Sequence, residues 1–417
     1  MTVVEFYDGV AISNMISCLA IKPERVVFVG DKKAIKDHKP VYERFVQRHN
    51  LNIEFSFRPV DRNKIDNIID VLTDIVQTQD EYIFDLTGGD DLVLVAMGVV
   101  YEKYKDSKKI LMHRINITTG SVADCDRDGI LVVTRMPKMS VEDNIMIYGG
   151  DIAPFSEDGG TYVWDFNDDF VKDVKVLWDI CREKPWLWNT FTTSLGCVAK
   201  DYCPKSYQLE FAAKKPSDKG NSKNKADNEI VWVQEYIREF LKHGFIRKYR
   251  EDKDGNVSFS FRDAQIKRCL TIAGTVLELI TSIYCSEVEN KDGRLFDDVA
   301  TGVMIDWDAE FHAENDVIKD TENEIDVILM HGLVPVFVSC KNGQYDDEAL
   351  YKLETVAGRF GGPYAKKVLI STYYGKENND DHEHFVQRAK DMDIQLIQKA
   401  HKLTREEFLT KLRSLRL

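Results

Sequence analysis

The feature that most constrains the fold is an alternation of short apolar runs and helical patterns over residues 1–150. The runs at 25–29 and 82–84 have the length of buried strands and are followed by Gly or Asp. Apolar residues recur at helical spacing between them, as over 62–78 and 91–104. Strands that alternate with helices predict a parallel sheet with helices on both faces. The expected fold class is α/β, with a Rossmann-like N-terminal domain.

The remaining sequence divides into two parts. Residues 151–288 are mainly helical, and a helix that ends at Gly244 is followed by a strand pair turning at Asp254-Gly255, the outline of a winged helix. Residues 289–417 return to mixed α/β patterns. A chain of 417 residues suits two or three domains. We expect a ligand-sensing domain over 1–150, a helical, winged-helix-like linker over 151–288 and a C-terminal α/β domain over 289–417.

Composition and targeting signals argue against a membrane or secreted protein. The longest apolar run, at 92–100, is far shorter than the roughly 20 residues that a membrane helix needs. The N-terminus lacks a basic region followed by an apolar stretch. The 8 cysteines form no CxxC pair and are interpreted as reduced thiols. We expect a cytoplasmic protein with no membrane partner.

The net charge of −14 is concentrated in one segment. Residues 287–326 contain 14 Asp and Glu against 3 Lys and Arg, which leaves a local charge of −11. Most charged runs are solvated surfaces. Here, however, the last acid, Asp326, enters an apolar strand, and carboxylates in such a setting are suitable ligands for Mg²⁺ or Mn²⁺. Basic segments at 214–225 and 238–250 could guide a nucleic-acid backbone toward this acidic centre.

A predicted hairpin around residues 331–333 pairs Asp326 with Lys341, which ends the next apolar strand. Lysine is uncommon in strands unless it is exposed or paired. An Asp and a Lys on neighbouring strands, with an acid from a preceding helix, can supply both a metal ligand and a charge that stabilises a phosphodiester transition state. This is the PD-(D/E)xK nuclease arrangement. Asp297 or Asp298 is the expected helical acid.

One position departs from that arrangement. The usual pattern has a carboxylate two residues before the lysine, whereas this chain has Ser339. A hydroxyl is a weaker, neutral metal ligand. Either the metal depends on Asp326, on Asp297 or Asp298 and on a backbone carbonyl such as that of Cys340, or the site is weakened.

A glycine motif marks a second candidate site. Asp85-Leu-Thr-Gly-Gly89 follows a strand and opens a helix, where backbone N–H groups and glycines allow close approach of a phosphate or nucleotide. It lacks the Walker lysine and the GxGxxG spacing. Because strand ends of a parallel sheet form the ligand crevice, other polar residues should join it. The predicted ligand contacts are Gly9, Ser13, Asn14, Thr87, Gly88, Gly89, His113 and Arg114. Ser13 and Asn14 could equally cap a helix.

Together these motifs resemble the CARF-domain nucleases that accompany type III CRISPR systems. The resemblance is carried by Asp85-Leu-Thr-Gly-Gly89, Asn323-Glu-Ile-Asp-Val327 and Phe337-Val-Ser-Cys-Lys341. It implies a homodimer with one CARF and one restriction-endonuclease-like domain per chain, activated by a cyclic oligoadenylate, most simply cyclic tetra-adenylate. It also implies metal-dependent nicking or cleavage of DNA, with RNA among the substrates, in antiviral defence. Asp326 would be the central metal ligand, and Lys341 would orient water or stabilise developing charge.

A function from another class also fits the sequence. A CARF sensor with a winged helix and an inactive nuclease fold would be a transcription regulator. Ser339 favours that alternative, whereas the pair of Asp326 and Lys341 favours an enzyme. An activator-independent, restriction-type enzyme is a further alternative.

Overall fold

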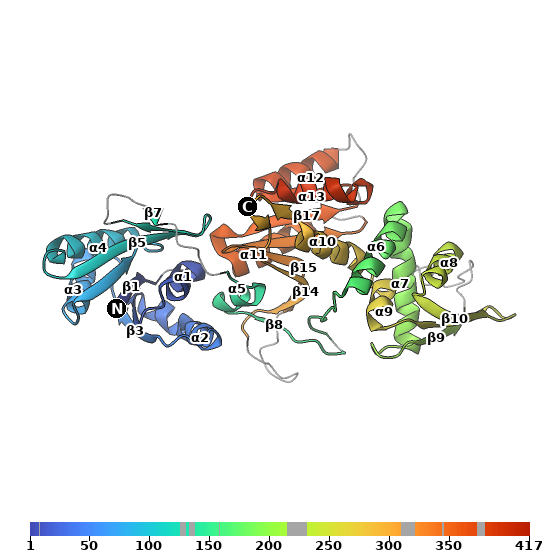
Figure 1. The fold of residues 1–417 in the computed structure, drawn as a ribbon, viewed down its shortest axis with the longest axis horizontal. Coiled ribbons are helices and arrows are strands. Elements are labelled where there is room, and N and C mark those ends of the chain that lie inside the picture. Colours follow the sequence, from blue (N-terminus) through green and yellow to red (C-terminus); the bar gives the residue numbers. More distant parts are fainter. Residues whose placement is uncertain are drawn as a thin grey trace.

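The computed structural model describes the chain except for residues 8, 126–130, 133–137, 158, 215–231, 310–321, 344–345 and 373–379. Most of the basic segment 214–225 therefore lies outside the described residues. The molecule is elongated, with an N-terminal α/β part at one end, a mainly helical part at the other and a second α/β part between them (Figure 1). The predicted α/β class is confirmed.

The N-terminal part is a seven-stranded sheet in the order β3-β2-β1-β4-β5-β6-β7. The first five strands in that order are parallel, as predicted, and the last two are antiparallel. Two separate apolar clusters cover its faces, because the central strands are buried on both sides. The strands are β1 (Thr2–Phe6), β2 (Arg25–Gly30), β3 (Glu54–Pro59), β4 (Glu81–Asp85), β5 (Lys109–Asn116), β6 (Ser121–Asp124) and β7 (Leu131–Val132). The helices are α1 (Ala11–Ile21), α2 (Lys32–Arg48), α3 (Ile65–Val76) and α4 (Asp91–Tyr104).

The helical part contains the predicted winged-helix outline. Helix α8 (Gln234–Lys242) is followed by Gly244, whose φ of +70° suits glycine, and then by the hairpin of β10 (Ile246–Glu251) and β11 (Asn256–Phe261). Strand β9 (Glu210–Lys214) completes a three-stranded sheet. Helices α6 (Asp168–Glu183) and α7 (Pro185–Tyr202) pack beside it.

The helical segment that leads into the C-terminal part consists of two helices and not one. Helix α9 (Ala264–Thr271) and helix α10 (Thr275–Glu287) meet at an angle of 118°. The break falls at Gly274, whose φ is +91°. Glycine adopts this backbone conformation at little cost, so the chain can turn sharply there.

The C-terminal part is a six-stranded sheet in the order β18-β17-β16-β15-β14-β8. Strands β15 (Glu322–His331) and β16 (Val334–Lys341) form the predicted hairpin, with Val327 opposite Val338. The other strands are β8 (Asp151–Ile152), β14 (Asp298–Asp306), β17 (Lys366–Ser371) and β18 (Ile394–Ile397), and a small separate ribbon joins β12 (Glu289–Asn290) to β13 (Gly293–Arg294). Helices α10, α11 (Glu348–Gly361), α12 (Asp380–Asp391) and α13 (Arg405–Arg413) surround the sheet, with the short helices η1 (Gly362–Tyr364) and η2 (Ala400–Lys402).

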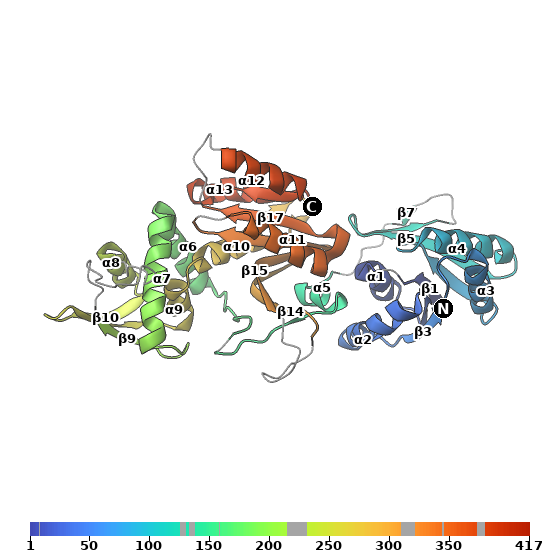
Figure 2. The ribbon, with the colours of Figure 1, turned by 180° about the vertical axis from the view of Figure 1, so that it is seen from behind.

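Helix α5 (Val141–Ile147) lies between the two α/β parts in both views (Figures 1 and 2). Its N-terminus is a capping box of Ser140 and Asp143. Asp143 also accepts a bond of 3.0 Å from Nε of Arg48 on α2, while Asn144 donates a bond of 2.6 Å to the carbonyl of Phe360 on α11. One apolar cluster runs from the N-terminal sheet through α5 to α11, so the two parts share a continuous core.

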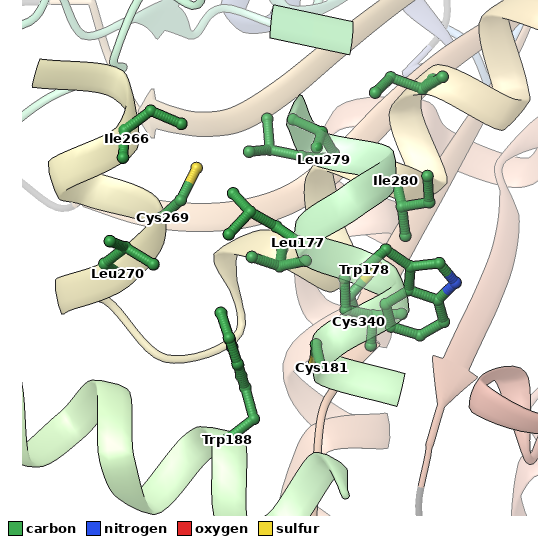
Figure 3. Close-up of a cluster of buried hydrophobic side chains, with 14 of the residues drawn as sticks. Leu177, Trp178, Cys181, Trp188, Ile266, Cys269, Leu270, Leu279, Ile280 and Cys340 are labelled. Atoms are coloured by element: carbon green, nitrogen blue, oxygen red, sulfur yellow. The ribbon is translucent and has the colours of Figure 1, made fainter. Parts of the chain in front are cut away.

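A second apolar cluster joins the helical part to the six-stranded sheet (Figure 3). Trp188 from α7 and Cys269 from α9 lie in this cluster with Leu279 from α10 and Cys340 from β16. All are almost fully buried. Burial of such side chains stabilises the contact by roughly 25 cal/mol per Å² of apolar surface, so α10 is fixed against the hairpin strands.

In the part of the chain that the structure describes, no individual helix combines the length and apolar composition needed to cross a membrane. The bent pair α9 and α10 meets those criteria only when its two helices are counted together.

Candidate functional site

A cavity of about 480 Å³ opens beside the hairpin of β15 and β16 and is bounded by helix α11. Asp326, Ser339 and Lys341 all line it, so the structure brings together three of the predicted site residues. The remaining lining residues are Asn323, Glu324, Ile325, Asp346, Glu348, Ala349, Lys352, Leu353 and Val356.

Asp326 is held in place by donors from the neighbouring strand. Its Oδ2 atom accepts a bond of 2.5 Å from the backbone N–H of Cys340 and one of 3.2 Å from the Ser339 hydroxyl. The Lys341 ammonium lies 3.7 Å from the same oxygen. A carboxylate and a lysine fixed at the mouth of a cavity can hold a cation and stabilise negative charge on a phosphate.

Asp297 and Asp298 are not on a helix, and the prediction that either is the helical acid is wrong. Asp298 begins β14, and its carboxylate accepts a bond of 2.8 Å from the N–H of Val141. Asp297 directly precedes that strand and accepts a bond of 2.9 Å from the N–H of Gly332, beside an ion pair with Lys138. Because Asp298 pairs with Met330, both acids lie at the turn end of the hairpin, four residues along β15 from Asp326. The carboxylates of Asp297 and Asp298 are therefore engaged in hydrogen bonds with nearby backbone N–H groups.

The acid that a helix presents to this site is Glu278 of α10, which the sequence analysis missed. Its pKa is raised well above the usual value by burial, by the negative charge of Asp326 and by that of Glu324. Burial and Asp326 also raise the pKa of Glu324. Glu324 lies two residues before Asp326 on β15, so both side chains are on one face of the sheet. Three carboxylates thus interact across the hairpin and α10.

The sequence contains a feature that could have identified each of the two missed acids, Glu278 and Glu324. Glu278 is the one charged residue in Thr275-Val-Leu-Glu-Leu-Ile-Thr-Ser-Ile283, an otherwise apolar or hydroxyl-bearing helix start. A lone acid in such a run is costly to bury without a functional or structural partner. Glu324 could have been found from the strand period of two, which places residue 324 beside residue 326.

These residues fit a hard divalent cation in their donor chemistry. Among the described residues, no three His, Cys, Asp or Glu side chains are grouped closely enough to hold a metal ion. Burial is nevertheless the main cause that raises the pKa of Glu278 and of Glu324, and the charge of Asp326 raises both further, a repulsion that a dication would relieve. Oxygen donors from Asp326, Glu278 and Glu324 are the type that Mg²⁺ and Mn²⁺ prefer. Cys340, whose backbone carbonyl was a predicted metal ligand, is not among the residues that line this cavity, and its thiol lies 3.7 Å from the Thr281 hydroxyl.

The second candidate site is a cavity of about 630 Å³ at the carboxyl ends of the parallel strands. Its lining includes five of the predicted ligand contacts, namely Ser13, Thr87, Gly88, Gly89 and Arg114. Val10, Leu86, Leu94, Gly98, Met112, Cys125 and Tyr364 complete it. This volume is in the range of small-molecule sites, and the crevice lies where parallel α/β sheets bind ligands.

The other three predicted contacts do not line this cavity. Gly9 is exposed beside it. Asn14 is buried in α1 and donates a bond of 2.7 Å to the Tyr42 hydroxyl. His113 is paired in register between Asp85 and Asp124, and burial lowers the pKa of its ring. Nor do Ser13 and Asn14 cap α1, because its N-cap is Val10.

A buried carboxylate holds the glycine motif in shape. Oδ1 of Asp85 accepts a bond of 2.7 Å from the Thr87 N–H and another from the Thr87 hydroxyl, while Oδ2 accepts from the Ser17 hydroxyl. The Thr87 hydroxyl accepts a bond of 2.9 Å from the N–H of Ile115 on β5. Thr87 therefore joins two strands, and the glycines after it form the cavity wall.

The acids after the glycines have structural roles. Asp90 caps α4 by accepting a bond of 3.1 Å from the Leu92 N–H, and its carboxylate lies 2.7 Å from the Arg62 guanidinium. Hydrogen bonding to Arg62 lowers the pKa of Asp90. Pairing with Arg62 reduces the repulsion that Asp90 would exert on an anionic ligand.

We expect Asp85→Asn to raise the melting temperature more at pH 8 than at pH 5, by at least about 2 °C at the higher pH. Burial raises the pKa of Asp85, so the folded state keeps its proton when the unfolded state has lost it. Stability from this group is therefore present at low pH and lost as the pH rises through the folded pKa. Asparagine keeps an acceptor for Thr87 without ionising. Parallel thermal melts of both proteins across this pH range measure the effect, and an equal difference at both pH values would contradict it.

Comparison with known proteins found a matching family model and several similar structures. Residues 266–412 match the family model of the Card1-like endonuclease domain. A comparison with curated proteins found no match. Protein VC1899 from Vibrio cholerae has a similar structure, with a TM-score of 0.73 and 15% identity over 99% of this chain and 96% of that one.

A second similar structure is Can2 from Sulfobacillus thermosulfidooxidans in complex with cyclic tetra-adenylate. Its TM-score is 0.62, with 14% identity over 98% of this chain and 96% of the other. At these identities the likeness establishes the fold over nearly the whole length. The family match places Asp326, Ser339, Lys341 and the newly found Glu278 and Glu324 within an endonuclease domain.

Proposed function

We propose, starting from the Card1-like endonuclease domain of residues 266–412, that this chain is a metal-dependent endonuclease activated by a cyclic oligoadenylate. The observation that carries the proposal is the convergence of Cys340 N–H, the Ser339 hydroxyl and the Lys341 ammonium on one oxygen of Asp326 beside an open cavity. A transcription regulator with an inactive nuclease fold would have no use for a lysine held at this position.

The residues of the hairpin and α10 would have separate roles in metal binding, charge stabilisation and positioning. Asp326 would be the central ligand of Mn²⁺ or Mg²⁺, and Glu278 and Glu324 would move closer to it when the cation binds, because the cation relieves their mutual repulsion. The bound cation would supply charge neutralisation and lower the pKa of a water molecule. Lys341 would place its ammonium against the scissile phosphate and stabilise the developing negative charge. Ser339 would position Asp326 through its hydrogen bond, not act as an anionic ligand.

The cavity at the glycine motif would bind the activator. Its position at the strand ends and its Ser13, Thr87 and Arg114 lining suit a nucleotide with ribose, base and phosphate groups. The likeness in fold to Can2 in complex with cyclic tetra-adenylate supports cyclic tetra-adenylate as the first ligand to test. We propose a homodimer that places two such chains around one ligand.

Domain roles follow from the same arrangement. Residues 1–150 would sense the ligand, 151–288 would link, and 289–417 would carry the hairpin site, with α10 adding Glu278 from the linker side. The exposed Arg247, Lys248 and Arg250 of the winged-helix hairpin would contact the phosphate backbone of DNA or RNA.

Incubation of supercoiled plasmid with the protein tests the proposal. Nicking or linearisation is expected only when both cyclic tetra-adenylate and Mn²⁺ are present, and EDTA should stop it. Single-stranded DNA and RNA in the same conditions would rank the substrates. Sequence-specific DNA binding without cleavage of any of these would favour the transcription regulator, and equal cleavage without the ligand would favour an activator-independent enzyme.

Restoring the missing carboxylate should strengthen metal binding. We expect Ser339→Glu to lower the Mn²⁺ concentration for half-maximal cleavage at least about tenfold, because it adds an anionic ligand beside Asp326. Ser339→Gln has nearly the same size without the charge and is the matched control. Calorimetric Mn²⁺ titration should give the same order of affinity. Identical Mn²⁺ dependence of the Glu and Gln variants would mean that residue 339 does not face the cation.

A further inference from the structure

One residue that lines the ligand cavity comes from outside the N-terminal part. The other lining residues belong to the N-terminal part, within residues 10–125, but Tyr364 comes from η1 of the C-terminal α/β part. Tyr364 is half-buried and packs against the apolar cluster that α5 and α11 share. The endonuclease domain thus contributes a wall to the cavity of the sensing domain.

Tyr364 stands at the end of a segment that also reaches the candidate active site. Helix α11 is followed directly by η1, and the chain turns between them at Gly362. Glu348, Lys352 and Val356 of α11 line the cavity that holds Asp326 and Lys341. A helix of 14 residues is about 21 Å long, so α11 and the η1 turn that follows it lead from one cavity to the other. Figures 1 and 2 both place α11 on the side of the endonuclease sheet that faces the N-terminal part.

The junction between α11 and η1 is fixed by close packing. The carbonyl of Gly361 accepts a bond of 3.2 Å from the Tyr148 hydroxyl, next to the bond of 2.6 Å from Asn144 to Phe360. A Cβ atom on Gly361 would lie 2.6 Å from Cβ of Ala365, and Gly362 has a φ of +57°. The backbone at the junction, two residues before Tyr364, is therefore closely packed.

We propose that Tyr364 is a ligand-binding residue of the cyclic-oligoadenylate cavity and that it couples ligand binding to the active site through residues 348–364. A phenol ring is a sequence-tolerant surface for stacking on a nucleobase. A base that stacks on this ring contacts the endonuclease domain directly. This inference rests on the proposed function, because it takes the cavity to be the activator site.

The test compares Tyr364→Ala and Tyr364→Phe with the wild type, using cyclic tetra-adenylate as the probe. Calorimetry gives the affinity, and plasmid nicking at saturating ligand gives the activated rate. Tyr364→Ala should weaken binding by about 10-fold or more, as expected for loss of one stacking ring, and should also lower the saturated rate. Tyr364→Phe keeps the ring and should retain both. Tyr351→Ala, an exposed tyrosine of α11 that lines neither cavity, is the control.

The possible outcomes distinguish a failure of the inference about Tyr364 from a failure of the proposed function. If the wild type binds and is activated but Tyr364→Ala behaves like it, the inference is overturned and the proposed function stands. If Tyr364→Ala binds weakly but reaches the full saturated rate, the coupling is overturned. If the wild type neither binds cyclic tetra-adenylate nor responds to it, the proposed activator fails, and the inference fails with it. Circular dichroism melts of each variant exclude unfolding as the cause.

Discussion

Replacing Asp326 with asparagine is expected to lower the rate of activator-dependent plasmid nicking at least about 100-fold. Losses of this size follow removal of a single group that stabilises charge at a reacting centre. Asparagine retains the shape and an acceptor for the Cys340 N–H, so the fold should persist, but it carries no charge for a cation or for the Lys341 ammonium. Lys341→Ala should cause a loss of similar size.

Two variants of matched chemistry serve as controls for these substitutions. Asp297→Asn alters an acid whose carboxylate binds Gly332 and Lys138 at the turn end of the hairpin. It should change the rate less than about threefold, because Asp297 does not line the cavity of Asp326. Lys366→Ala is the matched control for Lys341→Ala, because it removes a lysine from the neighbouring strand β17. Loss of nicking in Asp297→Asn, with retention in Asp326→Asn, would mean that the site lies at the other end of β15.

Glu278→Gln is expected to lower nicking about 100-fold while making the metal-free protein more stable. Burial and the charges of Asp326 and Glu324 raise the pKa of Glu278, so its ionised form is unfavourable in the folded state. Stability from this group is present at low pH and declines as the pH rises through the folded pKa. Glutamine removes that decline, so the gain in melting temperature should be larger at pH 8 than at pH 5. Opposite changes in stability and activity are typical of functional groups held in unfavourable surroundings.

Glu287→Gln provides the control for Glu278 because both residues lie on α10. Glu287 lies 2.7 Å from Lys175 and 2.8 Å from Arg405 at the other end of the helix. Its substitution should slightly lower stability and leave nicking unchanged. Glu278→Gln with wild-type nicking in Mn²⁺ would assign Glu278 a purely structural role.

The approach of Asp326 to Lys341 could be predicted because its signals are local. Asp326 directly precedes the apolar run of β15, Lys341 ends β16, and the short turn between the strands places residue 327 opposite residue 338. Glu278 has no such local relation to the hairpin. Its approach depends on the turn at Gly274 and on the packing of α10 against β14, β15 and β16, neither of which periodicity predicts.

The cavity at the glycine motif shows why side-chain direction is hard to predict from the sequence. His113 and Arg114 are consecutive in β5, so their side chains point to opposite faces, and only Arg114 lines the cavity. Ser13 and Asn14 are neighbours on α1, and again one lines the cavity while the other binds Tyr42. The pattern identifies the strand end or helix start, but not which of two adjacent polar residues faces the ligand. Tyr364, from 250 residues further along the chain than Arg114, has no sequence signal at all.

Ligand activation of the hairpin site can be measured as the initial rate of plasmid nicking against the concentration of cyclic tetra-adenylate at fixed Mn²⁺. We expect negligible nicking without the ligand, a rise to a plateau as the ligand saturates, and no nicking at any ligand concentration by Asp326→Asn. A rate that is the same at every ligand concentration, or a plateau that Asp326→Asn also reaches, would contradict this expectation.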